Sequence, residues 1–164
     1  MATPTNLPSS FTSGDVLTAA QMNNLRGAFR ILQVASFETA TLATNSTTTF
    51  AASGLTISIT PQATSSKILI FSVSSIAKTA GNVSNAVNLR MRRGSTVLTS
   101  QTAVLFTGTG LIQVGTSPMI FLDSPNTTSA VTYDVQFANF VAAAQVEHNA
   151  NGSASTIVVM EVSA

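Results

Sequence analysis

The sequence predicts an all-β protein: an antiparallel, jelly-roll-like β-sandwich preceded by an extended N-terminal arm and one short α-helix. Segments rich in Val, Ile and Thr recur along residues 31–164, and β-branched residues favour strands. Clusters of Gly, Pro, Asn and Ser separate these segments, as expected for turns. No helical pattern lies between them, and about nine short strands joined by turns favour a sandwich.

The predicted arm covers residues 1–14. This stretch contains Pro4, Pro8 and Gly14 and has few residues that could be buried, a composition typical of a segment that is disordered in isolation. Such an arm becomes ordered mainly by docking. We therefore expect it to bind a partner or another subunit.

A short helix is predicted to follow the arm, in the phrase of residues 17–32. Thr18 precedes Gln21 by three residues, the spacing of a capping box that satisfies free backbone N–H groups in the first turn. Leu17 and Met22 occupy the two positions of a hydrophobic staple around this start, which fixes how the chain enters the helix.

The predicted helix carries an apolar stripe. Its members recur at spacings of three and four residues, the rhythm of a helical seam, and are Met22, Leu25, Phe29 and Leu32. A helix of about a dozen residues is marginal alone, so the stripe needs a partner surface. Two surfaces fit: the protein's own sheet, or the same stripe of other subunits in an oligomer.

The predicted strands follow directly. Their ranges are 31–38, 46–51, 54–60, 66–77, 86–92, 96–100, 111–122, 130–140 and 155–163. Apolar and polar residues alternate clearly in two of them, 54–60 and 130–140, which predicts strands with one buried face. The chain is thus predicted to have two regions: residues 1–30 for anchoring and oligomerisation, and residues 31–164 as the sandwich domain.

Composition narrows the choice of partners. Charged residues make up 8% of the chain and the net charge is +1, so little like-charge repulsion keeps copies apart, and other subunits are predicted to cover part of the surface. The basic residues are too few for a nucleic-acid phosphate backbone. No apolar run approaches the roughly 18 residues of a transmembrane helix. Neither nucleic-acid binding nor membrane insertion is expected, and the chain start lacks the features of a secretory signal.

The residues needed for catalysis are scarce. The chain has no Cys, one His and six acidic residues spread singly, whereas a zinc site needs several nitrogen or sulfur donors and a glycosidase needs two facing carboxylates. We therefore predict no enzymatic activity and no cofactor or metal. His148, next to Glu147 in a loop rich in Asn and Gly, is predicted to lie on the surface.

Candidate surface contacts are few. Arg90 and Arg92 are predicted to project from one face of their strand and Arg93 from the other. Guanidinium groups bind carboxylates and acidic sugars, so with His148 they are candidates for host-surface contact. The other interpretation is a solvated strand end or an inter-subunit salt bridge.

Aromatic residues offer a second candidate contact. A sugar-binding platform could form from Phe106, Phe140, Tyr133 and Phe137. The last two share the parity of Val131 and Val135, which favours the core for them instead. Loop tips near 78–86, 107–110 and 145–153 are predicted to face outward.

Several stretches resemble proteins of tailed bacteriophages. The phrase "FTSGDVLTAAQMNNLRGAF" (11–29) resembles the N-terminal part of fibre and appendage proteins. Four others are similar to a β-domain that recurs in tail-fibre-like proteins of aquatic phages: "GLTISITPQATSSKILI" (54–70), "LRMRRGSTVL" (89–98), "FLDSPNTTSAVTYDVQ" (121–136) and "STIVVMEVSA" (155–164).

This resemblance implies a structural protein of the virion, made in the host cytoplasm and usually homotrimeric. Residues 1–30 would then bind other virion proteins of the capsid or tail, and the sandwich would be a knob that contacts a host-surface glycan. The alternative is a head decoration (cement) protein that clamps capsid subunits. A free carbohydrate-binding module or enzyme is a third class, and it would require a monomer with a polar cleft.

Overall fold

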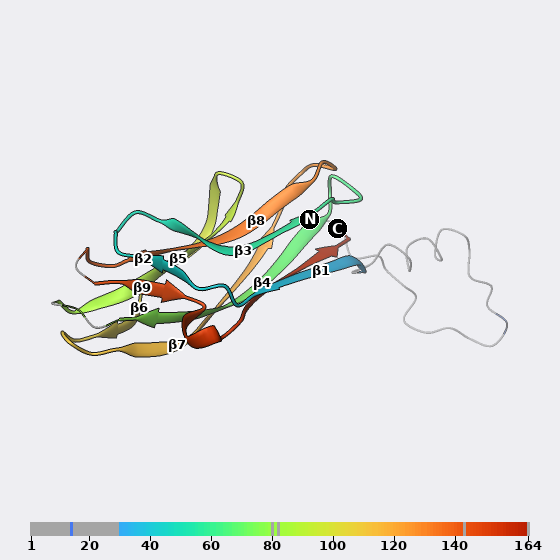
Figure 1. Ribbon diagram of the computed structural model, residues 1–164. Helices are drawn as coiled ribbons and strands as arrows, with labels where there is room; N and C mark the ends of the chain where they lie inside the picture. The colour runs from blue at the N-terminus through green and yellow to red at the C-terminus, as the bar shows by residue number, and fades with distance from the viewer. Residues whose placement is uncertain (1–13, 15–29, 80, 82, 143, 164) are drawn as a thin grey trace.

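The computed structural model describes residues 14, 30–79, 81, 83–142 and 144–163. These residues form two antiparallel β-sheets packed face to face (Figure 1). The predicted arm and helix, up to Phe29, lie outside the described residues. The predicted all-β sandwich is confirmed.

Each sheet contains strands from early, middle and late parts of the domain sequence. Sheet A contains β1 (Ile31–Thr39), β2 (Ala43–Asn45), β4 (Lys67–Lys78), β7 (Gln113–Asp123), β9 (Val146–His148) and β10 (Ser155–Val162). Sheet B contains β3 (Ala51–Ile59), β5 (Asn85–Arg93), β6 (Thr96–Thr107) and β8 (Val131–Asn139). A short 3₁₀ turn, η1 (Ala150–Gly152), separates β9 from β10.

The strand order is that of a jelly roll. In sheet A, β10 lies between β1 and β4, and β7 pairs with the other side of β4; in sheet B the order is β3-β8-β5-β6. The short strands β2 and β9 pair with each other and continue the β1–β10 pair past a break in each strand. With each broken strand counted as one, both sheets have four strands, the double Greek key of a jelly roll.

The core lies between the two sheets. Sheet A contributes side chains at alternate positions of its strands, among them Ile68, Ile70, Ile76, Ile157 and Val159. Sheet B contributes Leu55, Val87, Leu89, Met91, Tyr133, Val135 and Phe137. Burial of each large apolar side chain contributes roughly 1.5–3 kcal/mol. Tyr133 and Phe137 are fully buried, so their predicted place in the core is confirmed.

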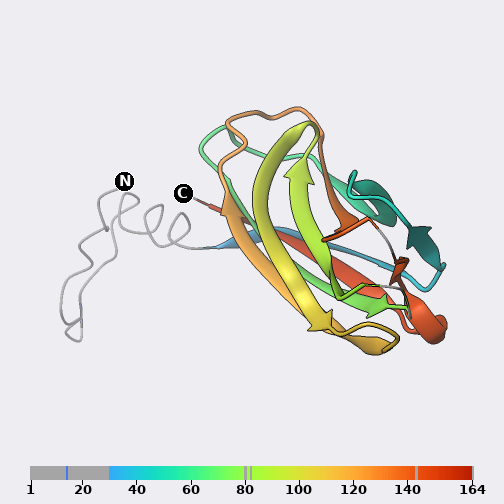
Figure 2. The same ribbon diagram turned by 90° about the vertical axis from the view of Figure 1, so that its left-hand side faces the viewer.

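The β5–β6 hairpin is strongly curved (Figure 2). Its register shifts twice between Asn85 and Leu89, and the facing β6 residues Ala103 and Leu105 have φ values of 58° and 53°. Irregularities of this kind are β-bulges, which bend a strand and increase its twist. The bend lets β6 close over one end of the core.

The structure corrects three strand predictions. The predicted strand 46–51 is mostly a loop, because the Asn45 side chain accepts a hydrogen bond from Thr47 N (2.8 Å) and donates to Thr49 O (2.9 Å) and so holds a turn. Strand β6 extends seven residues beyond the predicted end at residue 100, to Thr107. Strand β9 was not predicted, because three residues are too few to show alternation.

Leu32 is also corrected. It was predicted as the last member of the helical stripe, but it lies in β1, which begins at Ile31. The stripe can therefore hold only Met22, Leu25 and Phe29, which lie outside the described residues.

An ion pair links the two sheets. Asp123 of β7 accepts two hydrogen bonds from the Arg93 guanidinium of β5, at 2.9 and 2.8 Å. The Tyr133 hydroxyl of β8 donates to the same carboxylate at 2.8 Å. Burial and then the neighbouring Asp123 raise the pKa of Tyr133, so its hydroxyl stays protonated as a donor. Asp123 is 5% exposed, and water therefore screens this cluster weakly.

Breaking this cluster should destabilise the sandwich. We expect Asp123→Asn to lower the free energy of unfolding by about 3 kcal/mol, because it removes the charge partner of Arg93 beside a buried tyrosine. The matched control is Asp134→Asn, which removes a more exposed pair with Arg92 and should cost about 1 kcal/mol or less. Urea unfolding of both variants measures the difference, and equal losses would contradict this account.

Candidate functional site

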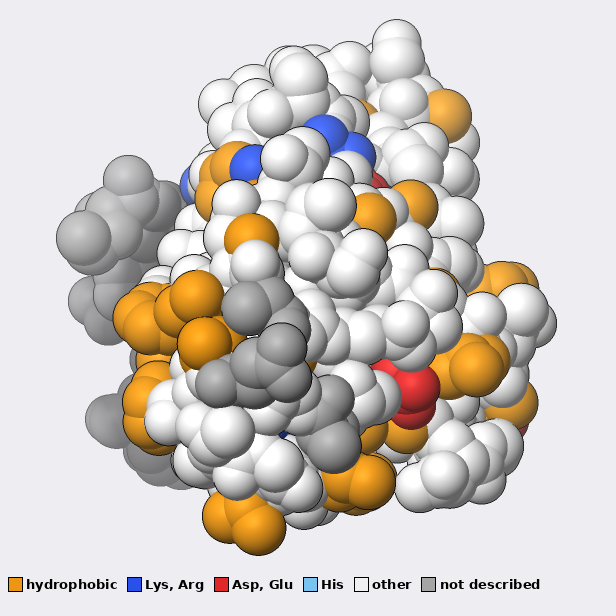
Figure 3. Space-filling model, turned by 60° about the vertical axis from the view of Figure 1, so that its left-hand side comes forward, with side chains coloured by type: hydrophobic (Ala, Val, Ile, Leu, Met, Phe, Trp, Pro, Cys, Tyr) orange, Lys and Arg blue, Asp and Glu red, His pale blue; other side chains and the backbone are white. Residues whose placement is uncertain are grey.

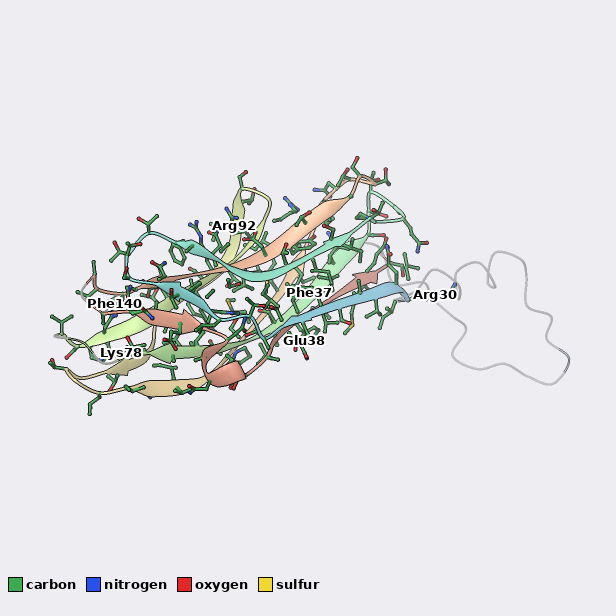
Figure 4. The ribbon with its side chains drawn as sticks, in the orientation of Figure 1. Arg30, Phe37, Glu38, Lys78, Arg92 and Phe140 are labelled. Carbon is green, nitrogen blue, oxygen red and sulfur yellow. The ribbon has the colours of Figure 1, made fainter. Side chains whose placement is uncertain are left out.

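The two ends of the sandwich differ. At one end the described chain begins and ends: Ser163 N donates to Arg30 O at 2.9 Å and Arg30 N donates to Ser163 Oγ at 3.0 Å. At the opposite end the described parts of three connections meet, which we call the tip: residues 79, 81, 83–84, 108–112, 140–142 and 144–145. Figure 4 shows Arg30 at one end and Lys78 and Phe140 at the other.

A buried lysine holds one loop of the tip. Lys78 ends β4 and is fully buried. Its Nζ donates to Gly108 O at 2.8 Å and to Leu111 O at 2.9 Å, which compensates for removing the ammonium group from water. Gly110 N donates to Gly81 O at 2.9 Å and joins a second loop. These hydrogen bonds thus join the connection 108–112 to the end of β4 and to Gly81.

A buried pair of asparagines holds the third loop. Asn85 Nδ2 donates to Asn139 Oδ1 at 2.6 Å, and Asn85 Oδ1 accepts from Val141 N at 2.8 Å. Asn139 Nδ2 donates in turn to Asn45 O at 2.8 Å. Because buried amides must find partners, this network specifies one loop conformation.

Apolar side chains cover the outside of these fixed loops. Phe106 and Phe140 are 56% and 42% exposed, and their rings meet edge to face with centroids 6.3 Å apart. Leu111 and Ile112, in the connection after β6, and Val141, next to Phe140 in the sequence, are also exposed. Figure 3 shows hydrophobic side chains in several groups on this end. Exposed apolar groups gathered at one end indicate a contact surface, and the tip is therefore the candidate functional site.

The predicted aromatic platform divides between core and tip. Tyr133 and Phe137 are buried, whereas Phe106 and Phe140 lie together on the tip. The sequence placed both among the candidates but gave no sign that strands β6 and β8, which lie on either side of β5, finish at the same end of sheet B. That information comes only from the sheet topology.

Two of the predicted surface arginines lie on the outer face of sheet B, away from the tip. Arg90 lies 4.2 Å from the centroid of the Phe50 ring and donates to Gln136 Oε1 at 2.8 and 2.6 Å. Arg92 pairs with Asp134 at 3.0 Å. Both guanidinium groups have partners within the chain. Their role in host contact stays a prediction.

The third arginine, Arg93, belongs to the buried link with Asp123. It points to the other side of β5 from its neighbours, as predicted from alternation. Its guanidinium group joins sheet B to sheet A, so its observed contacts stabilise the sandwich.

The prediction that His148 lies on the surface is wrong. Its side chain is fully buried and lies 5.7 Å from the Phe137 ring, measured between centroids. Burial has a local cause: the chain folds back as η1, with Asn149 N donating to Ser75 O and Asn149 Nδ2 to Thr41 O, both at 2.8 Å. Burial lowers the pKa of His148 to about 4.

Other kinds of site were sought among the described residues. In that part of the chain, no three His, Asp or Glu side chains come together in a way that could hold a metal ion. None of its helical segments is long and apolar enough to span a membrane.

No protein-family model matches the chain, and no curated protein matches it. Among solved structures, the infectious bursal disease virus Gx strain is similar over 79% of this chain and 38% of that one, at 8% identity and a TM-score of 0.38. The VP2 subviral particle of the same virus covers 80% and 40%, at 11% identity and a TM-score of 0.34.

Dimeric latent PorU from Porphyromonas gingivalis covers 77% of this chain and 13% of that one, at 10% identity and a TM-score of 0.32. The chain spans about two fifths of the length of the viral chains and far less of PorU. At such low scores these likenesses carry no argument about function.

The buried histidine predicts an acid-sensitive fold. A base whose pKa falls from its ordinary 6.5 to about 4 in the folded state takes up a proton more readily when unfolded. The contribution of His148 to the free energy of unfolding is therefore complete above pH 6.5 and is lost as the pH falls toward 4. Lowering the pKa from 6.5 to about 4 corresponds to about 3 kcal/mol of stability lost over that pH range.

We expect His148→Leu to remove that part of the pH dependence. Chemical unfolding at pH 7 and pH 4 measures it, with the wild-type protein as the reference. The carboxyl groups titrate in both proteins, so the difference between them isolates the histidine. An equal loss of stability in both would contradict the assignment.

Proposed function

We propose that this protein is a non-enzymatic structural protein of a tailed bacteriophage, a homotrimeric fibre or knob attached to the particle through residues 1–30. The observation that carries the proposal is the polarity of the sandwich. Arg30 lies at one end of the sandwich, and the tip with its exposed aromatic and aliphatic side chains lies at the opposite end. The resemblance of the sequence to phage fibre proteins supports the same assignment.

In this proposal the tip contacts the host surface. The faces of the Phe106 and Phe140 rings can pack on the C–H groups of a sugar ring, and nearby loop carbonyl and amide groups can hydrogen-bond its hydroxyls. A single shallow contact of this kind is weak. Three tips on one knob would raise the avidity by roughly 10²–10⁴, provided that they can reach the surface together.

The trimer would be assembled in part by residues before the sandwich. Met22, Leu25 and Phe29 are proposed as the seam that gathers three chains, now without Leu32. So short a seam holds weakly alone. Contacts between the sandwiches would have to contribute to the trimer as well.

A second candidate is a head decoration protein. The tip residues Leu111, Ile112 and Val141 are aliphatic and exposed, and such side chains suit a protein surface as well as a glycan. In this version the arm, residues 1–14, clamps neighbouring capsid subunits, and no receptor is needed.

The host-contact proposal predicts a specific loss of binding. Full-length protein carrying Phe106→Ser and Phe140→Ser should bind candidate host cells at least tenfold more weakly than wild type, because both ring faces are gone. The matched control is Val97→Ser, an exposed apolar residue of β6 away from the tip. Binding of fluorescently labelled protein is measured by flow cytometry, with native mass checked for each variant. Equal binding by wild type and the double variant would contradict the proposal.

The decoration proposal predicts a different loss. Deletion of residues 1–14 should abolish attachment to purified capsids and lower the temperature at which they release DNA, because the clamp is missing. Sedimentation with capsids and a thermal-release assay measure both effects. Capsids of unchanged stability, with the full-length protein bound or absent, would exclude this version.

A further inference from the structure

The outer face of sheet A is apolar across four strands. Two successive rows of paired residues cross it, from β1 through β10 and β4 to β7. The first row is Val34, Met160, Leu69 and Leu122, and the second is Ser36, Val158, Phe71 and Ile120. The next row is Glu38, Thr156, Val73 and Pro118, so it is apolar only on β4 and β7. None of the side chains in the first two rows is charged, and Ile120, in the second row, is 61% exposed.

The outer face of sheet B is polar by contrast. Arg92 pairs there with Asp134, Arg90 with Gln136, and the Ser58 hydroxyl lies 2.7 Å from the Thr132 hydroxyl. The same sandwich thus has one outer face suited to water and one that is not. A sheet exposed on one side normally alternates between apolar and polar residues, so the composition of sheet A's outer face indicates that something covers it.

The face is large enough to be the centre of an interface. Four strands about 4.8 Å apart, over about five residues of 3.4 Å rise, give roughly 300 Å² of flat sheet. An apolar patch of roughly this size is comparable to the largest patch on a typical monomer, and such patches often mark a contact. Standard interfaces bury about 800 Å² per partner, with an apolar centre and a polar rim. Ser36 and Thr156 supply part of such a rim.

We infer that the outer face of sheet A binds a second copy of this chain, an inference that rests on the homo-oligomer of the proposed function. Continuity supports this occupant: at the β1 edge the apolar face continues into Ile31, which is exposed, and Arg30 joins it to the segment with the predicted oligomeric seam. In the sequence, Arg30 alone separates Ile31 from Phe29 of the predicted seam.

Charge supports the same occupant. The residues bordering the apolar rows carry opposite signs, Lys67 on β4 and Glu38 on β1. Figure 4 shows Glu38 pointing away from the core on the opposite side of β1 from Phe37. A net charge of +1 leaves weak repulsion between copies. In the proposed trimer, three such faces can meet around the threefold axis, so that each face contacts those of its two neighbours.

The absence of cysteine from the sequence gives a clean test. Single-cysteine variants of the full-length protein are made at Ile120, on the apolar face, and at Val97, which is exposed on sheet B. Both are treated with a maleimide, and the native mass of each is measured by light scattering. We expect Ile120→Cys to be labelled at least tenfold more slowly than Val97→Cys, in a particle that contains more than one chain.

Two outcomes would overturn the inference. Equal labelling rates would mean that the face is open to solvent. Slow labelling of a protein with the mass of one chain would mean that another part of the same chain covers the face.

A second pair of variants tests the interface by native mass, with the fold of each variant checked separately. Ile120→Lys should reduce the native mass to that of a smaller species, because an ammonium group would be buried between copies, whereas Val97→Lys should leave the mass unchanged. An Ile120→Lys protein that is folded by circular dichroism and keeps the wild-type mass would also overturn the inference. A protein that passes these tests but binds neither cells nor capsids would retain this interface and lose the proposed function.

Discussion

The architecture depends on sheet A being apolar on both faces. Its central strand β4 pairs with β10 and β9 on one side and with β7 on the other. The inward residues Ile68 and Ile70 pack against sheet B, while Leu69 and Phe71 point outward. Burying the inner face folds the domain. The exposed apolar side chains of the outer face would gain the same kind of free energy if a second copy covered them, which is the basis of the proposed association.

The ends of the sandwich follow from how the strands terminate. Lys78 and the Asn85–Asn139 pair are buried inside the sandwich. Their polar side chains hydrogen-bond to the backbone of the loops from the inner side. The loops can therefore carry apolar side chains on their outer surface, because these side chains are not needed to hold the loop backbone. At the other end, Ser163 and Arg30 are joined by two hydrogen bonds. In the proposed function, the anchoring end and the contacting end are thus separated by the length of the sheet.

Alternation in the sequence was enough to predict the sandwich and its core residues, because period-2 patterns such as 130–140 read directly onto one buried face. The run from Ile68 to Phe71 has no polar member, which is the local signal of a strand covered on both sides. Local patterns could not predict His148 in the core or Phe106 beside Phe140. These depend on a chain reversal at η1 and on which strands end together.

The central claim is that copies of this chain cover the outer face of sheet A, and the native mass of the wild-type protein over a dilution series tests it most directly. One chain has a mass of 16.9 kDa. The account predicts a multiple of that mass, three chains in the proposed trimer, which falls on dilution or with an added nonpolar cosolvent. A constant mass of one chain at every concentration would contradict it.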